Sequence, residues 1–313
     1  MVTTLQALKA AAEETRLRLL ALLETGEASV GELVIVLQQS QPRVSRHLKL
    51  LVAAGLVENF RDSHHVYYRL AEGASRSLLD EVLAGVRGDA GIEADLVRLS
   101  EVRHEREKDA YRRIDPKAAP TARAARADDE TIFAAIDDAL ADEDIGDLLD
   151  VRTGTGRLLT HLAPKAATAT GVDKSQAMRL LARTKVQQAG LAKCTLRNVD
   201  GKSLPFSPDS FDTVLLNESL TRADDLRSAL AEAVRVLRVG GRLLILDWIQ
   251  PTSLQNRADS EGLAENQLRT LLAENGLQIT ERSWLPGKAP DYALFIAAPA
   301  RGQNIKQTSG MSA

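Results

Sequence analysis

The chain has 313 residues, of which 44% are hydrophobic and 27% charged, and its formal net charge is −3. This length corresponds to about two domains on a prior of ~150 residues each, and the composition excludes wholesale disorder and collagen-like or coiled-coil monotony. The near-neutral charge gives no global attraction to nucleic acid, so any such binding requires a local patch.

The single cysteine, Cys194, excludes an intrachain disulfide and a cysteine-cluster metal site. No apolar run reaches the ~18 residues of a membrane span. Glu13 and Glu14 interrupt the place where a signal peptide needs an apolar core. These features predict a cytoplasmic protein.

Three regions and a tail differ in composition and hydrophobic pattern. We predict a small head over residues 1–72, a helical dimerisation connector with a hinge over 73–127, an α/β body over 128–300 and a disordered tail over 301–313.

The head begins with two short helices. The leucines from Leu17 to Leu23 fit an amphipathic helix that ends at Gly26, and Ser29 is the expected N-cap of a second helix through Leu37.

A third helix is predicted after Ser40 as its cap, with Pro42 in the first turn, where a missing amide hydrogen does no harm. No acidic residue occurs between Glu32 and Glu58, which makes this stretch locally electropositive. The expected core face of the helix consists of Val44, Leu48 and Leu51. The candidate DNA-binding residues on its other faces are Gln41, Arg43, Ser45, Arg46, His47 and Lys49.

A hairpin is predicted after the third helix, with residues 56–60 and 66–70 flanking a turn at 61–65. Helices followed by a hairpin describe a winged helix-turn-helix, whose last helix enters the major groove of double-stranded DNA. Arg61 and His64 in the turn are further DNA-binding candidates, near phosphate or the minor groove. The alternative is a helical adaptor with an exposed basic face.

Residues 5–72 resemble the winged-helix domain of the ArsR family of bacterial repressors, through residues 16–20, 41–55 and 66–70. The resemblance implies a repressor that binds operator DNA. Members of this family often sense metals through cysteines beside the second helix of the motif. Residues 28–37 contain no Cys, His or Asp, so we do not carry metal sensing over and expect no metal.

In the connector, two apolar helical faces are separated by a break at residues 88–91. The faces consist of Leu78, Leu79, Val82, Leu83 and Val86, and of Ile92, Leu96, Leu99 and Val102. We expect them to pair helices across a homodimer. Residues 103–113 are almost all charged, and the Pro- and Ala-containing run up to Ala127 predicts a flexible hinge.

The body alternates apolar strand runs with helical stretches. Seven strands are predicted, at residues 147–151, 167–172, 194–199, 211–216, 241–248, 277–285 and 293–297. Helical stretches separate the first five, as the crossovers of a doubly wound sheet require. The expected fold class is therefore α/β, with a winged helix-turn-helix ahead of a Rossmann-like body.

The first strand runs directly into a turn that contains Gly154 and Gly156, and glycines there let backbone amides approach a ligand closely. The second strand ends at Asp173, 19 residues after Gly154. At this spacing a carboxylate accepts hydrogen bonds from both hydroxyls of a ribose.

Further motifs follow in order at residues 171–175, 204–206, 210–214 and 233–241. Together they resemble class I S-adenosylmethionine-dependent methyltransferases across residues 145–300. The resemblance implies that Asp173 holds the ribose, Asp200 the adenine amino group and Met178 the adenine ring of S-adenosylmethionine or S-adenosylhomocysteine. Gly240 and Gly241 are expected to serve the turn into the fifth strand. The candidate cofactor-binding residues are Asp150, Arg152, Gly154, Gly156, Asp173, Met178, Asp200 and Asn217.

The sequence departs from the methyltransferase motifs at two places that bear on catalysis. Arg152 occupies the place of the first glycine in the usual motif, where its side chain clashes with a ligand unless the backbone shifts, the side chain points away, or the guanidinium pairs with the ligand carboxylate. Residues 217–222 lack the aromatic or His residues that small-molecule methyltransferases often place there. Glu218 is either a general base or, in the favoured interpretation, a solvated acid. No catalytic residue is assigned.

The favoured interpretation is a homodimeric transcriptional regulator, a repressor, whose methyltransferase-like body binds S-adenosylhomocysteine or S-adenosylmethionine as effector. An active methyltransferase with a DNA-binding head is the alternative, and a body that only supports a dimer is a third. The operator, a methyl acceptor and the preferred adenosyl ligand stay open, as does whether the ligand strengthens or releases DNA binding.

Overall fold

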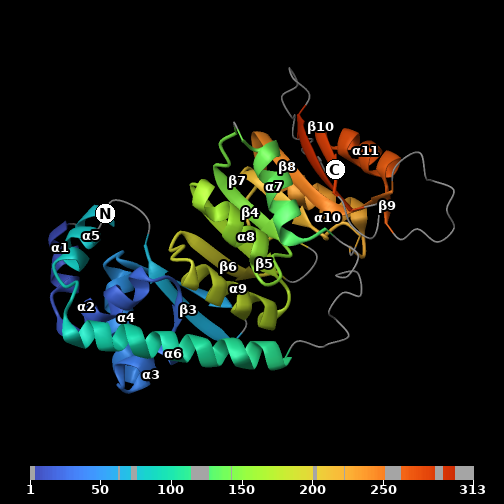
Figure 1. The fold of residues 1–313 in the computed structure, drawn as a ribbon. Helices are drawn as coiled ribbons and strands as arrows, with labels where there is room; N and C mark the ends of the chain where they lie inside the picture. Colours follow the sequence, from blue (N-terminus) through green and yellow to red (C-terminus); the bar gives the residue numbers. More distant parts are fainter. Residues whose placement is uncertain are drawn as a thin grey trace, which may run out of the picture. The chain divides into compact units, whose positions relative to one another are not determined.

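The computed structural model describes residues 4–62, 64–71, 76–113, 127–141, 143–199, 203–221, 223–250, 262–285 and 292–299. The chain divides into two compact units (Figure 1). The first comprises Met1–Ile114 and Gln176–Asn198, and the second Asp115–Ser175 and Val199–Ala313. The predicted hinge beyond Arg113 and the predicted tail lie outside the described residues, apart from Ala127.

The head of the first unit has the predicted order of helices followed by a hairpin. Its elements are α1 (Thr4–Ala11), α2 (Glu14–Glu24), β1 (Ala28–Ser29), α3 (Val30–Leu37), α4 (Gln41–Ala53), β2 (Val57–Asp62) and β3 (His65–Leu70). Strand β3 pairs antiparallel with both β1 and β2.

The predicted helix caps are present, with one difference. The Ser29 hydroxyl accepts from the Glu32 N–H, and the Glu32 carboxylate accepts from the Ser29 N–H at 2.7 Å, which completes a capping box. Ser40 occupies the N-cap of α4, but its side chain makes no capping hydrogen bond.

The wing is a longer hairpin than predicted. Pairing continues until Asp62 lies opposite His65, so Arg61 and His65 belong to the strands and not to the turn. Asp62 is also buried, with 2% exposure, although a turn residue was expected there.

Both apolar faces of the predicted connector pack on the head of the same chain. Helix α5 (Arg76–Ala84) buries Leu79 and Leu83, and α6 (Ala90–Arg113) buries Ile92 and Leu99, all in the core formed by α2, α3 and α4. This corrects the expectation that these faces pair helices across a dimer. Small domains bury a modest share of their surface, and the connector helices enlarge the core of this head.

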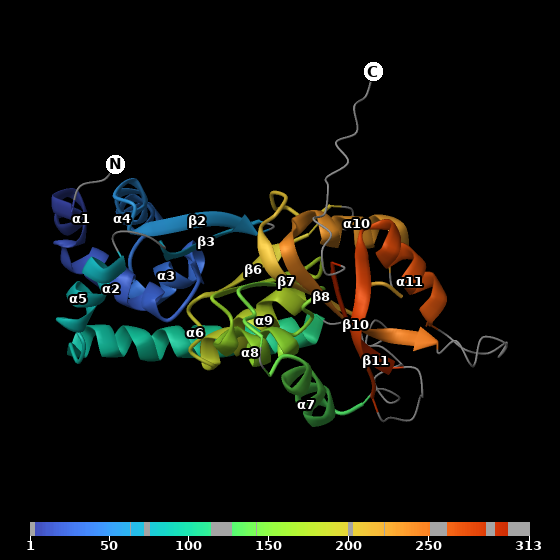
Figure 2. The same ribbon diagram turned by 90° about the horizontal axis from the view of Figure 1, so that it is seen from above.

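The first unit also contains a helix and a strand from the predicted body, α9 (Gln176–Gln188) and β6 (Cys194–Asn198). Helix α9 lies beside α6 (Figures 1 and 2), where Ala110 packs with Leu180 and Leu181. Burial raises the pKa of the Cys194 thiol to about 12, so this thiol stays protonated.

The second unit is built on a mixed, mainly parallel sheet. Its elements are α7 (Asp129–Ala139), β4 (Asp147–Val151), α8 (Arg157–Leu162), the short 3-10 helix η2 (Ala163–Lys165), β5 (Thr168–Asp173), β7 (Phe211–Asn217), α10 (Leu226–Val236), β8 (Leu237–Gln250), β9 (Leu263–Ala264), α11 (Glu265–Glu274), β10 (Leu277–Trp284) and β11 (Tyr292–Pro299).

Within this unit the strands lie in the order β10, β11, β8, β7, β4, β5, with β9 beside β8. Strands β5, β4, β7 and β8 run parallel, whereas β11 and β10 are antiparallel. The carboxyl ends of parallel strands meet at one edge, which is where ligands bind in sheets of this kind.

Each predicted strand is present, but β8 begins earlier than expected, at Leu237. Its register with β7 shifts near its start, and Gly240 (φ 84°) and Gly241 lie in this irregular part. A Cβ on Gly241 would stand 2.7 Å from the Asp212 carbonyl oxygen. The two glycines therefore serve a bulge inside the strand and not a turn before it. Strand β9 was not predicted, because two residues carry no periodicity.

Candidate functional site

The loop after β4 is tightly folded. Gly154 (φ 56°) and Gly156 (φ 75°) both have a left-handed backbone. The Thr153 N–H donates to the Val172 carbonyl at 2.9 Å, and the Gly156 N–H donates to the Thr153 carbonyl at 2.9 Å. A Cβ on Gly154 would meet only the Arg152 carbonyl, at 3.9 Å, so a ligand has close access to the backbone there.

Arg152 also has a left-handed backbone, with φ 61°. The chain therefore keeps the conformation of a glycine loop although it places a side chain where that conformation is disfavoured. The half-buried Arg152 makes no ion pair with any described residue.

Asp173, at the end of β5, closes this loop. Its Oδ2 accepts from the Gly154 N–H at 3.0 Å, and its Oδ1 accepts from the Ser175 N–H at 2.8 Å. The 19-residue spacing in the sequence is therefore a direct contact. Each carboxylate oxygen of Asp173 thus accepts one backbone amide.

Asp150 lies beneath the loop and is fully buried. Its Oδ2 accepts from the Thr153 hydroxyl at 2.7 Å. Burial raises the pKa of Asp150 to about 7, and the negative charge of Asp173 acts in the same direction. Asp150 is therefore partly protonated at neutral pH and supports the loop from below.

The end of β7 lies at the same edge of the sheet. Val151 pairs with Leu216, so the residues that follow β4 and β7 are neighbours. Glu218, like Arg152, is a non-glycine residue with a left-handed backbone, at φ 46°. Strained backbone of this kind clusters at ligand-binding sites.

Asn217 and Ser219 complete this edge. The buried Oδ1 of Asn217 has no hydrogen-bond partner among the described residues. The Ser219 hydroxyl donates to the Val151 carbonyl at 3.0 Å and ties the segment after β7 to the end of β4.

Asp247 in β8 shapes the same segment, and the sequence analysis missed it. This carboxylate is 0% exposed and accepts from the N–H groups of Leu220 at 2.9 Å and Thr221 at 3.2 Å. Burial raises its pKa. A lone acid inside an apolar strand was the available signal, because a buried polar group requires partners.

The loop of the second unit fits part of an adenosyl ligand. Asp173 provides an acceptor for hydroxyl groups, Gly154 an accessible backbone, and Asn217 an unpaired carbonyl oxygen for an amino group. Met178 lies half-buried on α9 in the first unit. Asp200 lies outside the described residues.

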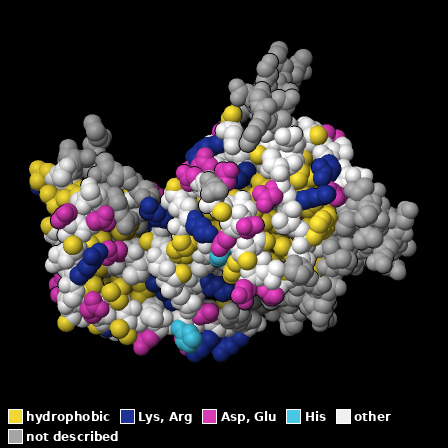
Figure 3. Space-filling view, turned by 45° about the horizontal axis from the view of Figure 1, so that its top comes forward, with side chains coloured by type: hydrophobic (Ala, Val, Ile, Leu, Met, Phe, Trp, Pro, Cys, Tyr) yellow, Lys and Arg dark blue, Asp and Glu magenta, His cyan; other side chains and the backbone are white. Residues whose placement is uncertain are grey.

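In the head, α4 presents the predicted polar face. Val44, Leu48 and Leu51 are fully buried, as expected. The exposed candidates are Gln41, Arg43, Arg46 and Lys49, whereas Ser45 and His47 are half-buried. Nδ1 of His47 lies 3.3 Å from Oε2 of Glu13, so this side chain contacts α2's cap residue. On the face drawn in Figure 3, basic and acidic side chains intermingle, in keeping with the near-neutral charge.

Of the wing candidates, Arg61 and His64 are exposed. Asp62 between them is held by Arg179 and Arg183 of α9. Sequence reasoning missed these two arginines, since arginine in a helix usually lies on a solvated face.

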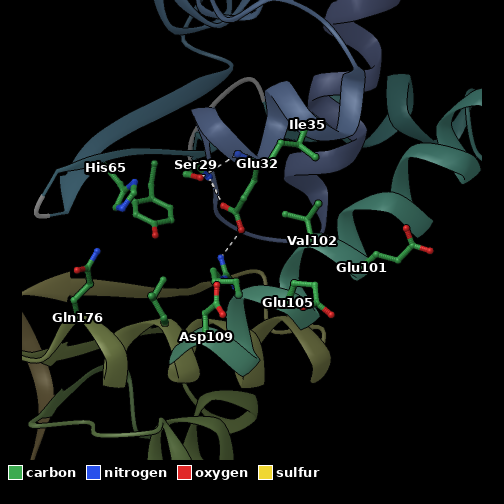
Figure 4. Close-up of a pocket in the computed structure, with 12 residues that line it drawn as sticks. Ser29, Glu32, Ile35, His65, Glu101, Val102, Glu105, Asp109 and Gln176 are labelled. Carbon is green, nitrogen blue, oxygen red and sulfur yellow. Dashed lines mark hydrogen bonds and ion pairs between the residues drawn. The ribbon is translucent and has the colours of Figure 1, made fainter. Parts of the chain in front are cut away.

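A cavity of about 490 Å³ lies within the first unit (Figure 4). Its wall includes His65 and Tyr67 of the wing, Glu32 of α3, Arg106 of α6 and Gln176 of α9. Nη1 of Arg106 donates to the Glu32 carboxylate at 2.6 Å. The arginine outweighs the effect of burial and keeps the pKa of Glu32 below its ordinary value.

Among the described residues, His, Cys, Asp and Glu form no group of three or more suited to a metal ion. In the same part of the chain, no helix is both long and apolar enough to span a membrane.

Two family models match separate segments. Residues 13–59 match the model described as a bacterial regulatory protein of the arsR family, and residues 149–245 match the model described as a methyltransferase domain. The strand order and the mainly parallel sheet of the second unit are typical of the class I methyltransferase fold.

The relatives found among known proteins match about a third of this chain. The ubiquinone/menaquinone biosynthesis C-methyltransferase UbiE of Geobacter sulfurreducens is 36% identical over 112 residues, which are 34% of this chain and 44% of that protein. The demethylmenaquinone methyltransferase of Thermus thermophilus is 36% identical over 106 residues, 33% of this chain and 48% of that protein. This chain therefore spans less than half the length of these relatives.

Among solved structures, the YcgJ protein from Bacillus subtilis has 21% identity and a TM-score of 0.43, covering 48% of this chain and 70% of that chain. The chain thus joins a segment that matches ArsR-family regulatory proteins to a segment that matches a methyltransferase domain.

Proposed function

We propose that the protein is a DNA-binding transcriptional regulator, a repressor, whose methyltransferase-like domain binds S-adenosylhomocysteine or S-adenosylmethionine as effector. The observation that carries the effector assignment is the hydrogen bond from the Gly154 amide to the Asp173 carboxylate. This bond joins the glycine loop to the acid that would hold the ribose.

Helix α4 of the head supports the proposed DNA binding. Arg43, Arg46 and Lys49 are exposed at intervals of three residues on α4, so they are neighbours on its surface. No acidic residue lies on α4 to oppose them. A helix of this kind enters the major groove, with cations on phosphates and polar side chains on base edges.

The residues around the loop after β4 favour an adenosyl ligand that acts as an effector over one that is a substrate for methyl transfer. Arg152 stands where backbone access is needed, and residues 217–221 offer one acid, Glu218, and no His or aromatic side chain. The acceptor at Asp173 is nevertheless intact. In this proposal the site binds an adenosyl ligand, and no residue of the site is assigned as a catalytic base.

A homodimer remains part of the proposal, on a surface other than the connector faces. Leu5 and Leu8 on α1 are 60% and 40% exposed, which is unusual for leucines of a helix that packs on the head. A dimer places two recognition helices about one DNA turn apart, ~34 Å. Sedimentation of Leu5→Glu tests this surface, and a dimer of unchanged stability would contradict it.

Calorimetric titration with S-adenosylhomocysteine and with S-adenosylmethionine tests the effector assignment. We expect binding that is strongly weakened by Asp173→Ala and unchanged by Glu281→Ala, a control at an exposed acid on β10, at the other end of the strand order from β4 and β5. The absence of heat with either ligand at millimolar concentration would contradict the proposal. DNA affinity that does not respond to a bound ligand would contradict the effector role alone.

An active methyltransferase is the second candidate, favoured by the methyltransferase activities for which the relatives are named. S-adenosylmethionine supplies an electrophilic methyl group, and alignment of an acceptor with it provides most of the rate, so a missing base does not exclude activity. A radiolabelled methyl-transfer assay over cell extract distinguishes the two. Labelling that depends on wild-type protein and is lost in Asp173→Ala would favour the enzyme.

A further inference from the structure

The first unit contains a cluster of buried charges that neither the ligand loop nor the recognition helix uses. Arg179 and Arg183, on successive turns of α9, are 0% and 1% exposed. Two carboxylates of the head, Asp62 at the end of β2 and Glu27 ahead of β1, are 2% and 4% exposed. Buried charges persist only when they are paired, so the cluster is a specific contact between α9 and the head.

Both arginines hold Asp62. Nε of Arg179 donates to Oδ2 at 3.1 Å, its Nη2 donates to Oδ1, and Nη1 of Arg183 lies 2.8 Å from Oδ2. Burial by itself raises the pKa of Asp62, but the hydrogen bonds and charges of the arginines outweigh it and hold this pKa below its ordinary value. These ion pairs therefore hold the wing on α9, because they are shielded from water and are broken when the wing moves away from the helix.

A second set of contacts fixes the base of the wing. Nε of Arg183 donates to Oε2 of Glu27 at 2.9 Å, and Nε2 of Gln187 donates to the Glu27 carbonyl at 2.6 Å. The guanidinium of Arg183 also stacks on Tyr67 of β3, with Cζ 3.9 Å from the ring centroid. These contacts come from one face of α9. They hold the sheet of the head at two places, Glu27 ahead of β1 and Tyr67 on β3.

Helix α9 begins directly after the turn that follows Asp173 at the end of β5. Asp173, the proposed ribose acceptor, accepts from the Ser175 N–H at 2.8 Å, and α9 starts at the next residue, Gln176. Gln176 and His65 of the wing line the same cavity, from facing elements (Figure 4). One short, continuous stretch of chain thus leads from the proposed acceptor to the two arginines.

We propose that Arg179 and Arg183 are positioning residues that couple occupancy of the Asp173 turn to the orientation of the wing, with α9 as the connecting element. The inference rests on the proposed function, because it requires an adenosyl ligand at Asp173. A change in the first turn of α9 moves both guanidinium groups, and the carboxylates paired with them follow. By linkage, DNA that engages the wing changes ligand affinity by the same factor.

The test measures coupling in the full-length protein. The DNA probe is a fluorescent duplex recovered by the wild-type protein from a random-sequence pool, and the ligand is S-adenosylhomocysteine at a saturating concentration. The ratio of DNA Kd values with and without ligand should differ from one by at least about fivefold in the wild type. In Arg179→Gln and in Asp62→Asn the ratio should fall to within about twofold of one, while ligand affinity without DNA stays within about threefold.

Gln188→Ala, at an exposed position at the end of the same helix, is the matched control and should keep the wild-type ratio. Hydrogen exchange on the wild type gives a measurement that needs no variant: the ligand should change amide exchange in β2 and β3. Variants that keep the full ratio, or a wing whose exchange does not respond to bound ligand, overturn the coupling and leave ligand binding intact. A wild type that binds no ligand overturns the proposed function and the coupling with it.

Discussion

Replacing Arg152 by glycine should stabilise the second unit. Arg152 has φ 61°, and a left-handed backbone costs a residue with a Cβ roughly 1–2 kcal/mol. Glycine adopts this conformation freely but gains about 0.4–1 kcal/mol of unfolded-state entropy. The difference predicts a net stabilisation of about 0.5–1 kcal/mol, because the arginine makes no ion pair with a described residue that the substitution would remove.

Gly154→Ala provides the matched opposite change. Gly154 has φ 56°, and an added Cβ would meet only the Arg152 carbonyl at 3.9 Å, so the cost is conformational and not a clash. We expect a destabilisation of about the same size, ~0.5–1 kcal/mol. Gln38→Gly, at φ 53° in the head, repeats the relief of strain in the other unit.

Differential scanning calorimetry without ligand measures these effects. A change of this size shifts the melting temperature of the second unit by roughly 1–4 °C, upward for Arg152→Gly and downward for Gly154→Ala. A lower melting temperature for Arg152→Gly would refute the reasoning, since it would mean that side-chain contacts of the arginine outweigh its backbone strain. Weaker ligand binding by the same variant would show that the guanidinium pairs with the ligand carboxylate.

Four further predictions concern the two sites and the core. Arg46→Ala should weaken DNA binding and reduce the slope of log affinity against log salt concentration by about one unit. An unchanged slope in a series of mobility-shift assays would mean that Arg46 contacts no phosphate. Asp173→Ala should cost ~1.5–3 kcal/mol of adenosyl-ligand binding by calorimetry, and affinity equal to that of the wild type would exclude the ribose role. Asp150, whose pKa rises from 3.8 to about 7 on folding, adds stability that is complete below pH ~4 and is lost as pH rises through about 7. In Asp150→Asn the free energy of unfolding from denaturation curves should fall less steeply with rising pH. A fall as steep as that of the wild type would mean that another group causes it. Leu48→Ala should destabilise the head by ~2–5 kcal/mol in urea denaturation, because Leu48 is 0% exposed, whereas a loss below ~1 kcal/mol would mean that the site collapses around the smaller side chain.

Elements that depend on local pattern were predicted well. The strand over Asp147–Val151 has the predicted bounds, and the Ser29 cap is present with its Glu32 partner. Both follow from short-range physics: an apolar run bounded by polar residues, and a hydroxyl three residues from an acid. The contact between Gly154 and Asp173 was predictable for a related reason, since a βαβ unit of fixed length brings two strand ends together.

The roles of Asp62, Arg179 and the connector leucines were not predictable. Asp62 and Arg179 lie 117 residues apart, and nothing near either one indicates that it is buried. The apolar faces that contain Leu79 and Leu99 suit a partner helix or the chain's own core equally well, and the structure uses them in the core.

The sequence by itself determined the order of elements, the basic face of α4 and the residues of the ligand loop, because periodicity, capping and strand-end spacing act within a few tens of residues. The tertiary structure alone decided which apolar faces are buried, that Arg152 keeps a glycine-like backbone, and that α9 packs on the head. Burial and charge pairing depend on which distant surfaces meet, and no local pattern encodes that choice.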